Sequence, residues 1–449
     1  MRFYLKSKIS LLFLILFCCS KTFANVPIKE IVKSALQNNE QLFIAKQNLN
    51  ASKSKMIQCF SQYLPNLSLQ ASYAKNYNSP VISEFSIGGI TTETYFGFNS
   101  QADLKSWQVT LSQNIFSFGR IESLILNSIE NMKNAELDIK KIEQDIVFNS
   151  LSSYFQLVAD KISLDYANQN YEIAKLSLEK TKIMYKNGMA SDLDKNEAES
   201  SFLSAKQSIE KANDSLGLSL LTFRNVTGID QVDFSSLDFI EKDEENFVEN
   251  RRFEEITNEA YENNPDYQKA LINVNIAQNN LLFAKSNLFP SIVGQGNYSW
   301  SNSSYQTNPI NFDQTNWSVV LSANWNLFDG LNTQAKINEA NHLLDTAKAN
   351  LVLAKKTFDF EIKKSYFNHV SARKSAEIAK NVLASRQKSF EIAKVKYKKN
   401  AMSIIDFMDI QSKLSKAQQD YILSKLNLYI SYLQLKKTVG TLNIEEFGI

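Results

Sequence analysis

The sequence predicts an α+β protein in which one structural plan occurs twice, and three observations favour this fold class. Several motifs of the N-terminal half recur in the same order in the C-terminal half. Two very long stretches contain neither glycine nor proline and carry apolar residues at helical spacing. Each half also contains two short segments in which polar and apolar residues alternate, as they do in β-strands.

Residues 1–24 have the composition of a secretory signal peptide. Three basic residues precede the apolar run "ISLLFLILFCC", and "TFA" at residues 22–24 suits cleavage by a signal peptidase. The apolar run is too short to be a good membrane-spanning helix. We therefore expect this segment to be cleaved. Lipidation at Cys18 or Cys19 is an open alternative, which the bulky residues before them disfavour.

The composition argues against an enzyme and against a nucleic-acid-binding protein. The 49 basic and 47 acidic residues give a net charge of only +2, so the chain has no basic footprint for nucleic acid. His342 and His369 are its two histidines, and Cys59 is the one cysteine beyond residue 24. These residues are too few for the usual metal clusters or for Cys–His catalysis, and no phosphate loop is present. We expect no catalytic residue, cofactor or metal.

The internal repetition is visible in paired motifs. They are "LPNLSLQASY" from Leu64 with "FPSIVGQGNYSW" from Phe289, "SWQVTLSQNIFSFG" from Ser106 with "NWSVVLSANWNLFDG" from Asn316, and "FRNVTGID" from Phe223 with "LKKTVGTLN" from Leu435. Each half therefore reads as a helix, two strands, a very long helix, a turn and a second long helix.

These motifs give the following boundaries. The first repeat covers 25–228, with strands at about 66–77 and 106–116 and long helices at 118–187 and 192–226. The second repeat covers 253–443, with strands at about 291–301 and 316–327 and long helices at 330–399 and 404–439. A charged connector, 229–252, lies between the repeats, and residues 444–449 form a tail.

The long helices are predicted from uninterrupted stretches without glycine or proline. Such stretches run from Arg120 to Asn187 and from Leu331 to Val439. Apolar residues recur in them at intervals of three and four, with small residues among them, which is typical of closely packed coiled coils. At 1.5 Å per residue, the first stretch would be roughly 100 Å long, which exceeds the size of a compact globule.

The predicted strands have the length and aromatic content of membrane strands. In "NWSVVLSANWNL", Trp317, Val319 and Leu321 point to one side and serines and asparagines to the other. Each strand is close to the roughly 9–11 residues that a tilted transmembrane strand needs. The four tryptophans of the chain lie in these strands, as expected for an aromatic belt at the membrane interfaces: Trp107, Trp300, Trp317 and Trp325.

A soluble β-sandwich would also have alternating strands, so this alternative stays open for any single strand. Four strands cannot close a barrel, however, and an open sheet edge is not tolerated in lipid. Membrane insertion would therefore require several chains to combine their strands. The polar segments 78–105 and 302–315 contain glycine or proline and match the long exposed loops of outer-membrane barrels.

Together these features resemble the TolC family of outer-membrane efflux proteins over residues 26–443. The shared signals are the duplication, the Leu64–Pro65 and Phe289–Pro290 corners, "NLFDG" from Asn326, the turn motif "YKKNAMSIIDFMDIQSKLSKAQ" and "VGTLN" from Val439. The resemblance implies a homotrimer in which twelve strands form one outer-membrane β-barrel. It also implies that twelve helices form a periplasmic tunnel.

The resemblance further implies a passive exit duct of a tripartite efflux pump or a type I secretion system. Its partners would be a periplasmic adaptor (membrane fusion) protein and an inner-membrane transporter of the RND, ABC or MFS type. Drugs, metals and secreted proteins all remain open as cargo. The alternative function is a secreted coiled-coil adhesin or scaffold without a channel.

Each pair of long helices is joined by a turn that is followed by two acidic residues. The segments are "YKNGMASDLDKNEAE" from Tyr185 and "YKKNAMSIIDFMDIQ" from Tyr397. Gly188 and Asn400 stand where a left-handed helix cap is expected. Carboxylates in the first turn of a helix stabilise its N-terminus, which is the ordinary role of Asp194, Glu197, Asp406 and Asp409.

The resemblance assigns further roles to this region. Asp406 and Asp409 share one helix face, which in the family lines the periplasmic mouth, so we expect a cation-selective gate there. Tyr397 resembles a gate-latch tyrosine whose hydrogen-bond partner would be Asp194. Some relatives have a basic residue where this chain has Met402, so the sequence leaves undecided whether the latch is a salt bridge. Ordinary turn packing is the alternative for the expected adaptor-docking residues, which are Asn187, Gly188, Met189, Asn400, Ala401 and Met402.

Overall fold

A computed structural model of the chain describes residues 28–443 except for 79–80, 88–89, 97–99, 230–247, 250, 306–310 and 400. The predicted signal peptide, most of the charged connector, the C-terminal tail and Asn400 therefore lie outside the described residues. The chain forms two compact units. Unit 1 comprises Met1–Lys46, Leu137–Gln268 and Leu353–Ile449, and unit 2 comprises Gln47–Glu136 and Lys269–Val352.

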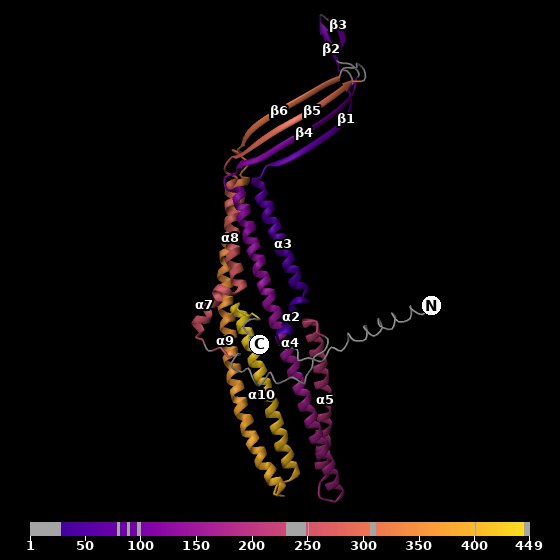
Figure 1. Cartoon of the computed structure of the whole chain (residues 1–449), viewed down its shortest axis with the longest axis vertical. Helices are drawn as coiled ribbons and strands as arrows, with labels where there is room; N and C mark the ends of the chain where they lie inside the picture. Colours follow the sequence, from indigo (N-terminus) through magenta and orange to yellow (C-terminus); the bar gives the residue numbers. More distant parts are fainter. Residues whose placement is uncertain are drawn as a thin grey trace, which may run out of the picture. The chain divides into compact units, whose positions relative to one another are not determined.

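The described helices and strands follow one another in the order of two similar halves (Figure 1). The first half contains α2 (Ile28–Gln37), α3 (Glu40–Phe60), β1 (Asn66–Asn78), β2 (Val81–Ile87), β3 (Ile90–Phe96), β4 (Ser100–Phe116), α4 (Arg120–Lys186) and α5 (Asp192–Thr227). The second half contains α7 (Phe253–Asn263), α8 (Pro265–Ser286), β5 (Ser291–Tyr305), β6 (Asn311–Asn324), α9 (Asn332–Lys398) and α10 (Ile404–Val439).

Unit 2 contains an antiparallel sheet with the strand order β1-β4-β5-β6. The register places Trp107 of β4 opposite Trp300 of β5, and Tyr298 of β5 opposite Trp317 of β6. Because side chains alternate along a strand, these four aromatic residues lie on the same face of the sheet. This face is open in the single chain, where Trp317 is 76 % exposed.

The segment between β1 and β4 contains strands that the sequence did not predict. Residues 78–105 were expected to be a polar loop, but β2 and β3 pair as a second, two-stranded sheet within this segment. β4 also begins at Ser100, six residues before the expected start. The β-branched and aromatic residues of "VISEFSI" favour a strand, but they were outweighed by the glycines and polar residues around them.

The first strand of the second half, β5, begins at Ser291 as predicted, but its end and both ends of β6 differ from the prediction. β5 continues to Tyr305 and β6 begins at Asn311, so both extend into the expected loop. β6 ends at Asn324, and two successive residues with positive φ, Gly330 and Leu331, then turn the chain into α9. Left-handed residues of this kind allow the sharp change of direction that leads directly into α9.

The helices of unit 2 pack through small side chains. Cys59, Ile121 and Ile125 form one buried cluster, and Val274 with Ala277 contributes to another. Alanines at such contacts allow helix axes to approach closely. Cys59 is 7 % exposed and packs as an apolar side chain.

Unit 1 contains the largest cores of the two helix pairs. One cluster surrounds Phe155 of α4 and Tyr429 and Leu433 of α10, all of which are almost fully buried. Two smaller clusters resemble each other, because in each an isoleucine of a short helix packs near a residue of a long helix. Ile31 of the short helix α2 packs near Phe223 of α5, and Ile256 of the short helix α7 packs near Leu435 of α10.

Gly440 permits a close contact at the end of α10. Its φ of +85° is left-handed, and a Cβ atom at this position would lie 2.4 Å from the Asn263 carbonyl oxygen. Its own carbonyl accepts a hydrogen bond of 2.6 Å from Gln144. A side chain at this position would therefore push the end of α10 away from the backbone that joins α7 to α8.

None of the described helices combines the length and the apolar content that a membrane-spanning helix requires. The described residues also contain no group of three or more histidine, cysteine, aspartate or glutamate side chains placed to hold a metal ion.

His369 connects α9 to the end of the charged connector. Its side chain is 1 % exposed, and its Nε2 accepts a hydrogen bond of 3.2 Å from the Glu249 backbone N–H. Its Nδ1 lies 3.2 Å from the Ser431 hydroxyl, which itself donates to the Leu428 carbonyl at 2.7 Å. Nδ1 must therefore carry the proton, and the imidazole is neutral. Burial lowers the pKa of His369, with Glu249 opposing this shift and Arg373 adding to it.

This environment makes the contribution of His369 to stability dependent on pH. Because its folded pKa is lowered, the unfolded chain takes up the proton first as the pH falls. The contribution is therefore present above the ordinary histidine pKa of 6.5 and is lost as the pH falls from there through the folded pKa. We expect the thermal-unfolding midpoint of the wild type to exceed that of His369→Gln at pH 8 and to converge with it toward pH 5.

The control is His342→Gln, because His342 is exposed and lies on the same helix. The thermal-unfolding midpoint of His342→Gln should equal that of the wild type at every pH. An identical pH dependence for the wild type and His369→Gln would contradict the assignment.

Candidate functional site

The candidate site consists of the two turns that join α4 to α5 and α9 to α10, both in unit 1. In the first turn, Gly188 has a φ of +67° and donates its N–H to the Tyr185 carbonyl at 3.0 Å. The Met189 N–H donates to the Met184 carbonyl at 2.8 Å. This pair of hydrogen bonds is a Schellman motif, which satisfies the free carbonyls at the end of α4.

The second turn forms one of the same hydrogen bonds. The Ala401 N–H donates to the Lys396 carbonyl at 2.9 Å, which matches the Met189–Met184 bond of the first turn. Asn400 directly precedes Ala401 and was expected to be left-handed, but it lies outside the described residues. The two turns therefore share this bond at the helix end.

Both returning helices begin with a serine cap that the sequence analysis missed. Ser191 and Asp194 form a capping box at α5, with hydrogen bonds from the Ser191 N–H and hydroxyl to Asp194 Oδ2 of 2.8 and 2.7 Å. At α10 the Ser403 hydroxyl donates to Asp406 Oδ2 at 2.7 Å and accepts from the Asp406 N–H at 3.0 Å. The spacing Ser-x-x-Asp in both turns was the available signal.

These caps give two predicted site residues a structural role. The Ser191 hydroxyl and then its backbone N–H lower the pKa of Asp194. Asp406 has the same cap geometry at α10 and an exposed side chain. One lone pair of Asp406 Oδ2 is used by Ser403, so the rest of the carboxylate stays available to other partners.

Asp409 is exposed and forms an ion pair with Lys413, one helical turn further along α10. Asp406 and Asp409 are separated by three residues, so they share a helix face. Lys413 offsets one of the two negative charges, and the three side chains together carry a net charge of −1. Glu197 is exposed on α5.

Tyr397 packs within its own helix pair. Its ring stacks on Phe407 of α10, with ring centres 4.8 Å apart and planes 12° apart. Within the described residues of the single chain, Tyr397 makes no hydrogen bond to Asp194, whose Oδ2 is bound by Ser191. The expected latch pair is therefore not brought together inside one chain.

The first turn has a different contact at the corresponding place. Lys195 Nζ lies 5.0 Å from the centre of the Tyr185 ring, which is a cation–π geometry. The hydrogen bond with Asp192 raises the pKa of Tyr185. Alignment of the two turn motifs would have indicated that Lys195 and Phe407 occupy equivalent positions.

The expected adaptor-docking residues that the structure describes are mostly exposed. Asn187, Gly188 and Ala401 are exposed, Met189 is 64 % exposed, and Met402 is half-buried. Leu193 adds to this surface with 73 % exposure and was missed by the sequence analysis. The first turn thus presents a small apolar surface beside polar backbone.

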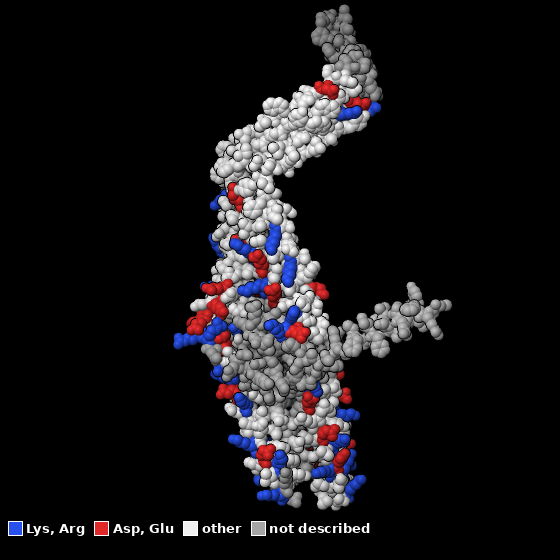
Figure 2. All heavy atoms as spheres, viewed as in Figure 1, with Lys and Arg blue, Asp and Glu red and all other residues white. Residues whose placement is uncertain are grey.

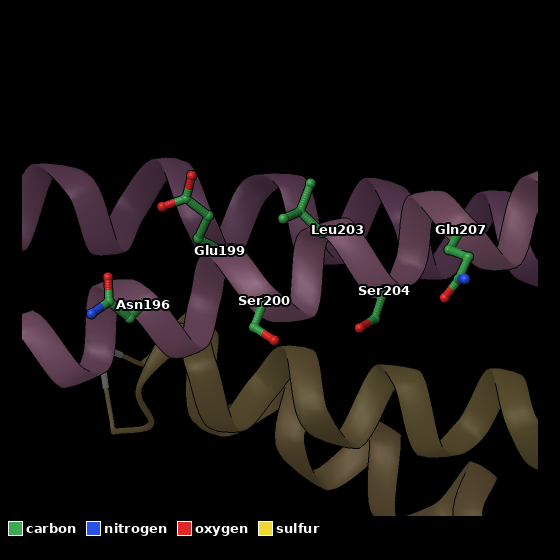
Figure 3. A pocket seen from close by; sticks show the side chains of 6 residues that line it. All are labelled: Asn196, Glu199, Ser200, Leu203, Ser204 and Gln207. Atoms are coloured by element: carbon green, nitrogen blue, oxygen red, sulfur yellow. The ribbon is translucent and has the colours of Figure 1, made fainter.

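α5 also carries an open groove of about 560 Å³ beyond this turn (Figure 3). Its lining residues lie on successive turns of the helix and are mostly polar: Asn196, Glu199, Ser200, Leu203, Ser204 and Gln207. This composition suits a hydrogen-bonding surface more than a pocket for an apolar small molecule.

The second feature of interest is the surface of the four-stranded sheet. Its charged residues gather at the end of the strands next to β2 and β3, and the rest of the sheet is uncharged on the face seen in Figure 2. These charged residues are Lys75, Asp103, Lys105 and Asp313.

The predicted belt tryptophans occupy two levels along the strands. Trp107 and Trp300 are half-buried and face each other across β4 and β5, with Trp317 next to them on β6. Trp325 lies just beyond the other end of β6, where its indole N–H donates to the Leu288 carbonyl at 3.0 Å. At roughly 3.3 Å per residue, Trp317 and Trp325 are separated by about 25 Å along the chain.

A family model described as outer membrane efflux protein matches residues 31–229 and 256–441 of the chain. The chain is 21 % identical to the outer membrane protein TolC of Vibrio cholerae, over 93 % of this chain and 92 % of that protein. It is 20 % identical to the probable efflux pump outer membrane protein TtgC of Pseudomonas putida, over 93 % and 84 %.

Solved structures have the same fold. A membrane protein from Pseudomonas aeruginosa superimposes with a TM-score of 0.75 at 17 % identity, covering 92 % of this chain and 93 % of that one. The CmeC outer membrane channel of Campylobacter jejuni superimposes with a TM-score of 0.74 at 17 % identity, covering 92 % and 85 %.

The caps allow a test of local stability at the turns. Ser191→Ala removes the hydroxyl that binds the Asp194 carboxylate and N–H, and such a loss costs about 1 kcal/mol. We expect the amides of the first turn of α5 to exchange hydrogen about fivefold faster, measured by mass spectrometry. Because the pKa of Asp194 is lowered, the wild-type protection should also decline as the pH falls through that pKa.

Ser208→Ala is the control, because the Ser208 hydroxyl bonds only the preceding turn of the same helix, at the Ser204 carbonyl. It should leave first-turn exchange unchanged. Equal exchange in Ser191→Ala and the wild type would contradict the capping role.

Proposed function

Because the chain belongs to the outer membrane efflux protein family, we propose that it is the passive exit duct of a tripartite efflux pump or type I secretion system, gated at its periplasmic tip. The family match covers both repeats and agrees with the resemblance drawn from the sequence motifs. The protein is an outer-membrane protein of the channel type, and we propose that its β-barrel and helical tunnel are formed by a trimer. An adhesin or scaffold without a channel is not favoured.

The observation that carries this proposal is the open four-stranded sheet. β1 and β6 are its edges, and its aromatic face is exposed in the single chain. Three copies that join edge to edge would pair every strand and direct the aromatic face to lipid. The matched relatives are themselves outer-membrane proteins, which supports this environment.

The family match to residues 31–229 and 256–441 supports the proposed organisation of the chain into two repeats. Residues 1–24 would direct export, and the repeats 25–228 and 253–443 would each contribute two strands and two long helices. The connector 229–252 would join them, with the tail 444–449 following the second repeat. Channels of this family work without catalysis, and transport energy would come from an inner-membrane transporter.

We further propose that the turns contact a periplasmic adaptor protein. The exposed Met189 supports this role, because a flexible apolar side chain at a turn can pack against another helix. Asn187, Gly188, Asn400, Ala401 and Met402 would complete the docking surface. An inner-membrane transporter of the RND, ABC or MFS type would use the same duct.

Asp406 and Asp409 are the proposed gate residues. In a trimer they would provide six carboxylates and, with Lys413, a net negative ring at the tunnel mouth. Such a ring attracts cations. Tyr397 and Asp194 remain the proposed latch, formed between helix pairs of the assembled trimer, because they do not bond within one chain.

Two experiments test the proposal, and the first addresses the membrane belt. Trp107, Trp300, Trp317 and Trp325 should lose fluorescence in bilayers of brominated lipid, most strongly when bromine is near the headgroups, where belt residues lie. Trp317→Phe should reduce the quenched fraction, because Trp317 is 76 % exposed. Bilayers without bromine are the control, and quenching only by deep bromine would contradict the belt.

The second experiment measures the gate by single-channel conductance of the purified protein in planar bilayers. We expect Mg²⁺ to block the wild type and the double variant Asp406→Ala, Asp409→Ala to need about tenfold more Mg²⁺ for the same block, because the carboxylate ring is removed. Asp420→Ala is the control, since Asp420 is an exposed acid further along α10. An absence of conductance would refute the duct, and unchanged block would refute the gate.

A further inference from the structure

Three aromatic rings connect the end of α9 to the start of α10. The Phe407 ring of α10 lies 4.8 Å from Tyr397 with a plane angle of 12°, and 5.6 Å from Phe390 with a plane angle of 29°. Phe390 and Tyr397 are two helical turns apart on α9 and therefore share a face. One ring of α10 thus contacts two rings of α9.

The first helix pair lacks this stack, although its backbone turn is similar. Counting from Tyr185 and Tyr397, the positions of Phe390 and Phe407 correspond to Leu178 and Lys195. Leu178 is buried and Lys195 lies over the Tyr185 ring. The aromatic stack is therefore a feature of the α9–α10 pair and not a general requirement for making the turn.

We propose that Phe407 is a positioning residue of the gate, which holds Asp406 and Asp409 in place by packing against Tyr397 and Phe390. This inference rests on the proposed gate function of the two aspartates. Phe407 follows Asp406 directly and precedes Asp409 by two residues, so packing of its ring fixes the helical turn that carries both carboxylates.

The geometry of α10 supports this role. The Ser403 cap holds Asp406 from the N-terminal side, and the Lys413 ion pair holds Asp409 from the C-terminal side. Both contacts lie within the start of α10, and neither connects it to α9. The ring stack supplies a connection across the helix pair, so that the carboxylates keep their positions relative to α9.

The stack also gives Tyr397 a second function beside the proposed latch. The Tyr397 ring lies nearly parallel to Phe407, which is itself held by Phe390, so this stacking restricts the rotamers of Tyr397 and directs its hydroxyl. Loss of Phe407 would release the tyrosine and the first turn of α10 together. The gate would then be less ordered even though its carboxylates remain.

The test compares variants of Phe407 in planar bilayers with Mg²⁺ as the blocking ion. Phe407→Leu keeps apolar bulk without a ring, and Phe407→Tyr keeps the ring. We expect Phe407→Leu to need about three- to tenfold more Mg²⁺ for block, the range that loss of an aromatic pair corresponds to, and Phe407→Tyr to match the wild type. Lys195→Ala is the matched control on the other helix pair and should also match the wild type.

A second measurement does not depend on conductance. Hydrogen exchange at the amides of residues 401–409 should be faster in Phe407→Leu than in the wild type and Phe407→Tyr. Unchanged exchange, or unchanged block with faster exchange, would overturn the inference.

The outcomes separate this inference from the proposed gate. If removal of Asp406 and Asp409 weakens block and Phe407→Leu does not, the carboxylates form the gate without help from the stack, and the inference alone is wrong. If neither change affects block, the gate assignment itself fails and the inference fails with it. Equal loss of block in Lys195→Ala would also overturn the inference, because the effect would not be specific to the ring stack.

Discussion

The backbone hydrogen bonds of the sheet edges are the constraint on which the rest of this structure depends. β1 and β6 each have a strand neighbour on one side only, and they flank a sheet whose aromatic face is open. Unpaired amides and carbonyls cannot be left in hydrocarbon, so a sheet of this kind enters a membrane only as part of a closed barrel. Four strands per chain thus require an assembly, and the trimeric family fold supplies one. In the proposed trimer the long helices would follow the same symmetry, because α4 and α9 each continue the chain from a strand.

The duplication shows which parts of the plan are fixed by packing. The short helices α2 and α7 bury Ile31 and Ile256 beside the ends of α5 and α10, so both repeats use an isoleucine for the same purpose. The turns are less restricted, because exposed side chains contribute little to the core. Here the repeats differ, with Lys195 at one turn where the other has Phe407. The side chains of the two turns can therefore differ in function without lowering the stability of the fold.

The sequence was sufficient for the fold class because its main signals are local. Long stretches without glycine or proline and alternating strands report directly on helix and strand formation. The hairpin of β2 and β3 was missed because short strands among glycines resemble a loop. At the site, Ser191 and Ser403 could have been predicted from Ser-x-x-Asp spacing. The stack of Phe407 on Tyr397 could not, because it depends on how two helices are placed across a turn.

The capping role of Asp406 and its proposed gate role support each other. A carboxylate at a helix N-terminus is favoured by the helix dipole and is held in one orientation by the cap. Both properties suit a residue that must present a charge at a fixed place. Asp409 is different, since Lys413 offsets its charge and the pair is exposed to solvent. The charge of the proposed gate would therefore depend on the balance of two aspartates and one lysine in each chain, and Lys413 would set its strength as much as either acid does.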